Sequence, residues 1–123
     1  MMRPTTLRFI SHGLKNGPLP KADLYLDCRV IVNPFLEGGL FINHAALVVW
    51  MKQNNQPTID VFIKLILQGL STLSPRRRSP DEDPHRPMII CLFCAYGQHR
   101  SVAMKQLLAD AFRAPGHYIV EEV

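Results

Sequence analysis

The sequence predicts an α/β fold in which a mostly parallel sheet is flanked by helices. Three observations support this prediction. Short apolar segments alternate with segments of helical periodicity, which is the order expected of a parallel sheet with helical crossovers. The seven-residue apolar run Met88–Cys94 is typical of a central strand that is buried on both faces. Apolar residues after Thr58 recur at helical spacing and would form one face of a helix.

The first half of the chain is expected to contribute two strands and a helix. The alternating residues Leu7–Ile10 predict a short strand, which runs into the turn-rich loop Ser11–Pro18. A second strand is expected over Ala22–Val32 and should end at Asn33-Pro34, because proline lacks the backbone donor that a sheet requires. The nearly continuous apolar residues within Phe41–Gln53 favour a helix after that turn.

The second half should supply two more helices and two strands, the first of them Met88–Cys94. Thr58 suits the N-cap of a helix with a clear apolar stripe. That stripe consists of Ile59, Phe62, Ile63, Ile66, Leu67, Leu70 and Leu73. A last helix is expected to end at Pro115-Gly116, and His117–Val123 has the β-branched residues of a final strand. The stripe of the last helix consists of Val102, Ala103, Leu107, Ala111 and Phe112.

Residues 74–87, SPRRRSPDEDPHRP, differ in kind from the rest of the chain. Four prolines and seven charged residues predict an exposed, mobile loop. The basic run Arg76–Arg78 could touch a nucleic acid, but the acidic run Asp81–Asp83 cancels the local charge. A solvated insertion is therefore the favoured interpretation.

Composition places the chain among single-domain globular proteins. Its 123 residues suit one domain over 1–123, and 47% hydrophobic and 20% charged residues are ordinary for a packed core. Three cysteines do not suggest a disulfide framework, and the CxxC of Cys91 and Cys94 has no second CxxC to complete a zinc site. The longest apolar stretch, Ala45–Met51, is too short to span a membrane. A cytoplasmic protein without a metal or cofactor is expected.

The segment Cys94–Ser101 is expected to bind an anion, because it joins the buried strand to the next helix. Ligands of parallel sheets bind at the carboxyl ends of strands, and a helix start leaves backbone N–H groups for an anion. Gly97 lets the backbone approach a ligand, and Arg100 offers a planar fork for two phosphate oxygens. Ser101 can cap the helix or donate to the anion. The predicted phosphate-binding residues are Cys94, Gly97, Gln98, His99, Arg100 and Ser101.

The spacing from Cys94 to Arg100 also matches the CxxxxxR(S/T) loop of cysteine-dependent phosphatases. In that chemistry, loop amides and the arginine lower the pKa of the cysteine, whose thiolate attacks phosphorus. Phe93 stands where that class usually has a histidine, and no aspartate other than Asp27 offers itself as the general acid. Anion binding is therefore favoured over catalysis by Cys94, and over a purely structural loop.

A second polar group lies within the predicted strand Ala22–Val32. Asp27 and Arg29 are two residues apart and would share one face of a strand. Their opposite charges are costly to bury alone, so they either form a local ion pair at the sheet edge or reach the same site as Arg100. In the second case Asn33 would present its amide at the strand end.

The loop Ser11–Pro18 is the third candidate feature. Gly13 and Gly17 fit tight turns of the backbone. His12 and Lys15 would either meet a phosphate or remain solvated beside a satisfied turn.

These features, together and in this order, resemble the RapZ C-terminal domain family of RNase adapters. The matching stretches are Ser11–Pro18, ADLYLDCRVIVNP at Ala22–Pro34 and CAYGQHRSV at Cys94–Val102. The resemblance implies an α/β domain that binds an amino-sugar phosphate, glucosamine 6-phosphate. It also implies a part in binding small regulatory RNA, the formation of oligomers and no catalytic turnover. Its ligand contacts would include Asp27, Arg29, Asn33 and the phosphate-binding loop.

The sequence departs from the family in three respects. The 123 residues do not include the N-terminal P-loop domain of the parent proteins, so we do not expect ATP or GTP binding to carry over. The segment Glu121–Val123 stands in place of a basic tail, which weighs against RNA as a partner. Ala95 and Tyr96 replace smaller or hydroxyl-bearing residues, so we expect a narrower pocket and a different sugar.

Overall fold

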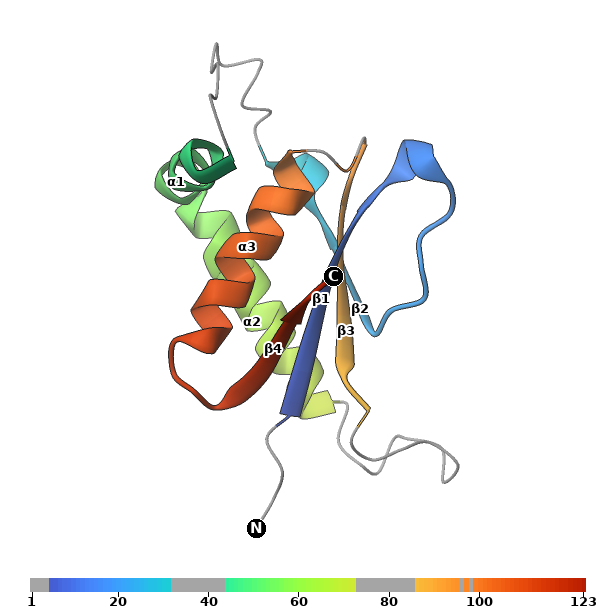
Figure 1. Cartoon of the computed structure of the whole chain (residues 1–123), viewed down its shortest axis with the longest axis vertical. Coiled ribbons are helices and arrows are strands. Elements are labelled where there is room, and N and C mark those ends of the chain that lie inside the picture. The colour runs from blue at the N-terminus through green and yellow to red at the C-terminus, as the bar shows by residue number, and fades with distance from the viewer. Residues whose placement is uncertain (1–4, 32–43, 73–85, 96, 98) are drawn as a thin grey trace.

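A computed structural model of the chain describes residues 5–31, 44–72, 86–95, 97 and 99–123, and it shows an α/β fold. Within these residues, four strands form one parallel sheet in the order β2-β3-β1-β4, and three α-helices pack on it (Figure 1). The strands are β1 (Thr5–Gly13), β2 (Leu24–Asp27), β3 (Met88–Cys94) and β4 (Tyr118–Glu122). The helices are α1 (His44–Asn54), α2 (Gln56–Thr72) and α3 (Arg100–Arg113). Two short 3-10 turns are η1 (Leu14–Asn16) and η2 (Cys28–Val30). The predicted fold class is confirmed.

The direction of each connection across the sheet explains where the helices lie. The chain moves from β2 to β3 and from β3 to β4 in the same direction, and the helices of both crossovers lie on one face (Figure 1). The connection from β1 to β2 runs the opposite way and passes over the other face (Figure 1). Parallel crossovers are right-handed in nearly all proteins, which accounts for this division.

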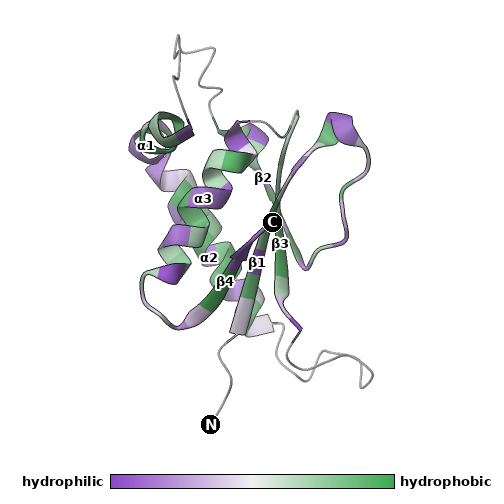
Figure 2. Cartoon of the chain, in the orientation of Figure 1, coloured by the Kyte–Doolittle hydropathy of each residue, from purple (hydrophilic) through white to green (hydrophobic). Residues whose placement is uncertain are grey.

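The core lies between the sheet and the helices. Leu7 and Phe9 of β1 alternate with residues that face the other side, and both are fully buried. On the central strand β3, Ile90, Leu92 and Cys94 face the same core. Figure 2 shows that β3 and much of α2 are coloured as hydrophobic, as a buried strand and an amphipathic helix require. The predicted buried central strand is therefore confirmed.

The second strand is shorter than predicted, and the first is longer. The expected strand Ala22–Val32 pairs as β2 and then turns into η2. The turn forms because a carboxylate oxygen of Asp27 accepts the backbone N–H of Arg29 at 2.9 Å, and such bonds compete with strand pairing. β1 extends to Gly13, so the start of the expected loop is paired with β3.

The helix boundaries also correct two expectations. Thr58 is not an N-cap, because α2 begins at Gln56 and Pro57 occupies the first turn, where no backbone donor is needed. On α3, Ala111 is exposed rather than part of the buried face. That face instead consists of Ser101, Ala103, Met104, Leu108, Ala109 and Phe112.

Most of the proline-rich segment, residues 74–85, lies outside the described residues. Its end is described and is firmly held, since Arg86 donates to both carboxylate oxygens of Asp23 at 2.8 and 3.0 Å. Asp23 also accepts the backbone N–H of Ile89 at 2.8 Å, so this pair ties the start of β2 to β3. Across the described ranges, no helix is long and apolar enough to cross a membrane.

Candidate anion-binding site

The carboxyl ends of three strands meet at one edge of the sheet. In the strand register, Gly13 at the end of β1 lies opposite Cys94 at the end of β3. Asp27 at the end of β2 lies opposite Phe93, the residue before that cysteine. The three polar features that the sequence singles out are therefore neighbours in space. This edge is where parallel sheets bind their ligands.

Gly97 fits where no other residue would fit. Its φ of 72° lies in the left-handed region, and a Cβ atom there would stand 2.5 Å from the backbone nitrogen of Gly13. The two turns are also joined by the backbone N–H of Lys15, which donates to the carbonyl of Ala95 at 3.0 Å. Gly97 was expected to let the backbone approach a ligand, and in the structure its backbone closely approaches the end of β1. Gly13, which the sequence places only in a turn, is the last residue of β1 and borders the candidate site.

Hydrogen-bond donors converge on the sulfur of Cys94. The backbone N–H of Gly97 donates to Sγ at 3.2 Å, and the Ser101 hydroxyl lies 3.3 Å from it. Burial raises the pKa of Cys94, but bonds from the Ser101 hydroxyl, the Ser101 and Gly97 backbones and the charge of Arg100 outweigh it and lower that pKa. Ser101 is fully buried inside α3, so it serves the sulfur and does not cap the helix. The loop can therefore stabilise negative charge at the strand end.

Arg100 lies across the gap between α3 and η2. Its Nη1 group donates to the carbonyls of Arg29 and Ile31, each at 3.4 Å, and these are long bonds. Among the described residues, no hydrogen bond engages Nε or Nη2 of this guanidinium. These two groups have the planar fork geometry that a phosphate would need.

Asp27 and Arg29 form a closed ion pair. The carboxylate accepts from Nε at 2.9 Å and from Nη2 at 2.8 Å, and the guanidinium stacks 5.5 Å from the centre of the Phe93 ring. The hydrogen bond from the Arg29 side chain is the main cause that holds the pKa of Asp27 below its usual 3.8. Of the two alternatives for this pair, the structure shows the local ion pair, formed through a turn and not along a strand face. The hydrogen bond from Arg100 to the carbonyl of Arg29 nevertheless places η2 beside the Cys94–Ser101 loop. Contact of this pair with a ligand stays a prediction.

The remaining candidates divide between placed and undescribed residues. Asn33 and Gln98 lie outside the described residues. His99 is exposed and precedes α3 without a side-chain capping bond. A ring nitrogen of His12 lies 3.0 Å from the carbonyl of Gly17, which favours the satisfied turn over a phosphate contact for this residue.

The CxxC pair is not arranged to bind a metal. Cys91 and Cys94 are three residues apart on β3, so their side chains point to opposite faces of the sheet. No group of three or more histidine, cysteine or acidic side chains that could hold a metal ion occurs among the described residues.

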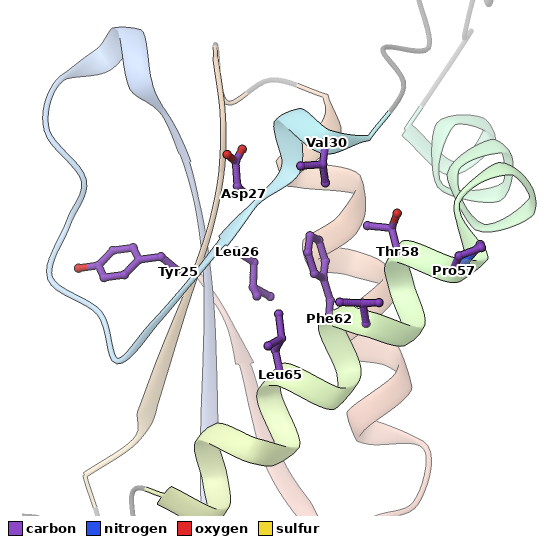
Figure 3. A pocket seen from close by; sticks show the side chains of 9 residues that line it. Tyr25, Leu26, Asp27, Val30, Pro57, Thr58, Phe62 and Leu65 are labelled. Atoms are coloured by element: carbon purple, nitrogen blue, oxygen red, sulfur yellow. The ribbon is translucent and has the colours of Figure 1, made fainter.

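An apolar groove of about 460 Å³ lies beside this site, between the edge strand β2 and α2 (Figure 3). Leu26, Phe62 and Leu65 point into it, and Asp27 and Val30 stand at the end nearest η2 (Figure 3). Its lining contains no Lys, Arg or His side chain, and the hydroxyls of Tyr25 and Thr58 are the side-chain donors in it, so the groove is poorly suited to bind a phosphate. Sequence reasoning missed the groove because it treated Phe62 and its neighbours on α2 only as core.

Comparison with known proteins gives a consistent family match. The family model described as the RapZ C-terminal domain matches residues 5–122. A nucleotide-binding protein of Cupriavidus metallidurans is 32% identical over 117 residues, covering 94% of this chain and 38% of the relative. One of Nitrosomonas europaea is 32% identical and covers 94% of this chain and 39% of the relative. A nucleotide-binding protein of Synechococcus is 29% identical over 121 residues, which cover 90% of this chain and 32% of the relative. The chain thus spans about two fifths or less of the length of these relatives.

Proposed function

The chain belongs to the RapZ C-terminal domain family, and on this premise we propose that it binds a phosphorylated small molecule at the Cys94–Ser101 loop. The family resemblance points to an amino-sugar phosphate. In this proposal, the loop amides hold the phosphate, and Arg100 clamps it through the side of its guanidinium that makes no hydrogen bond to the described residues. The buried Ser101 supports the Cys94 sulfur at the base of the loop. Asp27 and Arg29 stand beside it, where the polar body of the ligand would extend.

The observation that carries the proposal is the convergence of donors at the end of β3. The N–H of Gly97, the Ser101 hydroxyl and the Arg100 guanidinium gather around one point at a helix N-terminus. An arrangement that lowers the pKa of a buried thiol also favours the oxygens of a phosphate placed next to it.

The printed names of the relatives favour a ligand that carries phosphate. Those proteins are called nucleotide-binding proteins, and they are much longer than this chain. Phosphate is the chemistry that a nucleotide and a sugar phosphate share. A ligand panel that includes both classes separates them.

The test is isothermal titration calorimetry with glucosamine 6-phosphate, glucose 6-phosphate, AMP, ATP and inorganic phosphate. We expect saturable binding of a sugar phosphate by the wild type. Arg100→Ala should weaken it by about tenfold to a hundredfold, because a charge-assisted hydrogen bond is lost. Arg113→Ala is the matched control, since it removes an arginine at the other end of α3 that pairs with Asp110 and Glu122. Equal binding by the two variants would refute the clamp.

A cysteine-dependent phosphatase is the alternative, and the lowered pKa of Cys94 favours it. The state of Asp27 weighs against it. This carboxylate is locked to Arg29 and holds a lowered pKa, so it is poorly suited to protonate a leaving group. Phosphate release from a chromogenic phosphate ester, with Cys94→Ser as control, decides between them. If the wild type releases phosphate and Cys94→Ser does not, the phosphatase function would replace the proposal of a binding domain.

The RNA-adapter role, self-association and a cytoplasmic location stay predictions of the family resemblance. A gel-shift titration with small RNA across salt concentrations tests the first. An affinity that ignores salt would contradict contacts to the phosphate backbone.

A further inference from the structure

We propose that Cys94 is a site of oxidation by a hydroperoxide and that Cys28 closes a disulfide with it. The two residues come from different motifs, and neither Cys28 nor a role for it as a partner enters the binding site proposed above. Three features of the fold support the pairing.

The first feature is the register of the sheet. Asp27 of β2 lies opposite Phe93 of β3, and Cys28 and Cys94 are the next residue in each segment. Neighbouring strands lie about 4.8 Å apart, and disulfides join Cα atoms that are about 4.4 to 6.8 Å apart. Strand pairing ends at Asp27 and Phe93, and Cys28 begins the turn η2 directly after it, so each cysteine immediately follows one of two paired neighbours.

The second feature is the face on which the sulfurs lie. Cys28 and Cys94 both belong to the core cluster on the helix side of the sheet. Burial is the main cause that raises the pKa of Cys28, and the charge of Cys94 is the next cause, as expected for neighbouring thiols. Cys91 lies on the opposite face of β3 and outside that cluster. This cysteine cannot compete for Cys94 and is a natural internal control.

The third feature is the unequal environment of the two sulfurs. The Cys94 sulfur accepts from the backbone N–H of Gly97 and lies 3.3 Å from the Ser101 hydroxyl, an arrangement that suits a thiolate. The Cys28 sulfur donates to the carbonyl of Leu26 at 3.9 Å, and burial raises its pKa, so it stays a thiol. Cys94 therefore has the thiolate character that attack on an oxidant requires, and Cys28 supplies the second sulfur of the proposed disulfide.

The chemistry balances with the peroxide as the oxidant. The Cys94 thiolate attacks one peroxide oxygen, the O–O bond breaks, and the leaving hydroxide takes a proton and becomes water. The sulfenic acid on Cys94 is then attacked by the sulfur of Cys28, which gives up its proton. The S–O bond breaks and the hydroxyl leaves as a second water. The two thiols lose two electrons, and the peroxide gains them.

Disulfide formation should weaken ligand binding at the Cys94–Ser101 loop. Sγ of Cys94 would turn toward Cys28 and cease to hold the Gly97 amide and the Ser101 hydroxyl. This consequence rests on the proposed function, whereas the disulfide itself does not. Oxidation should therefore lower the affinity for glucosamine 6-phosphate by about tenfold or more, and dithiothreitol should restore it.

The experiment treats the whole chain with hydrogen peroxide and measures intact mass and a non-reduced peptide map. We expect an intramolecular disulfide between the peptides that contain Cys28 and Cys94, with Cys91 left as a thiol. Cys91→Ala should form the same disulfide. Cys28→Ala should instead give a Cys94 sulfenic acid that dimedone traps.

Three results would overturn the proposal. They are a disulfide that includes Cys91, a Cys94 that peroxide leaves unmodified, and an oxidised Cys94 that never pairs with Cys28 in the wild type. If the disulfide forms but the reduced protein binds no phosphate compound, the oxidation site stands and the proposed function fails. The wild-type map decides the pairing even where a variant is too unstable to use.

Discussion

The turns that follow β2 and β3 reach the same edge of the sheet, but their polar groups are paired in different ways. After β2, Asp27 uses both carboxylate oxygens on Arg29, so the two charges satisfy one another. After β3, donors gather on the Cys94 sulfur, and one side of the Arg100 fork has no hydrogen bond to the described residues. In the turn after β2, the opposite charges of Asp27 and Arg29 are paired with each other. In the turn after β3, part of the Arg100 guanidinium is available for the proposed ligand among the described residues. The proposed binding site is therefore distinguished by donors that make no hydrogen bond to the described residues, and not by the number of its charges.

The largest effect should follow from substitution of Gly97, which joins the β3 turn to the end of β1. Gly97→Ala would place a Cβ atom 2.5 Å from the nitrogen of Gly13 and would force a positive φ of 72° on alanine. We expect a loss of about 2 to 4 kcal/mol in the free energy of unfolding and no measurable binding of glucosamine 6-phosphate. Urea denaturation and calorimetry test this. Gly17→Ala is the control, because its added Cβ meets nothing within 4 Å. Equal losses in both variants would show that positive φ alone accounts for the effect.

A smaller effect is expected at Ser101, which supports the sulfur from inside α3. Ser101→Ala removes the hydroxyl that lies 3.3 Å from Cys94 Sγ. We expect the pKa of Cys94 to rise and stability to fall by about 1 kcal/mol, the usual worth of a buried hydrogen bond. The pH dependence of alkylation of Cys94 by iodoacetamide gives its pKa. An unchanged profile would mean that the backbone donors alone hold the thiolate.

The smallest effect should come from the closed pair after β2. The folded-state pKa of Asp27 is lowered, so the pair stabilises the protein above the usual value of 3.8. That contribution is lost as the pH falls through the lowered pKa. About a third of the side chain is exposed, so screening by solvent should limit the contribution to about 0.5 kcal/mol.

Asp27→Asn should therefore lower stability slightly at neutral pH and not at all in strong acid. Thermal unfolding from neutral pH to below pH 3.8 measures the difference. Arg29→Ala should behave in the same way and should change phosphate affinity far less than Arg100→Ala. If Arg29→Ala weakens phosphate binding as strongly, the contrast between the two turns is wrong.

Much of the architecture could be predicted because it depends on local pattern. The apolar run of β3 and the buried residues Ile59, Phe62 and Ile66 of α2 follow hydropathy directly, whereas Leu67 of the predicted stripe is exposed. The end of β2 could not be predicted in this way, because a single side chain, Asp27, draws the backbone of Arg29 into a turn. The start of α2 was missed because Pro57 is as well suited to a first helical turn as to a loop.

The candidate site could be predicted in its composition but not in its contacts. The residue types after β3 indicated an anion site because their order and their strand-to-helix setting are visible in the sequence. The contact of Gly97 with Gly13 depends on the pairing of β1 with β3, which no local pattern reveals. The apolar groove beside β2 depends in the same way on the packing of α2 against an edge strand (Figure 3).

The central claim is that a phosphate group binds at the β3–α3 turn. A ¹⁵N NMR titration with glucosamine 6-phosphate, repeated with inorganic phosphate, tests it most directly. We predict that the amide resonances of Gly97 and Ser101 and the side-chain Nε resonance of Arg100 shift the most. The amide resonances of Val61 and Leu65 in the groove should not shift. Saturating shifts confined to the groove, or no shift in the turn with either compound, would contradict the account.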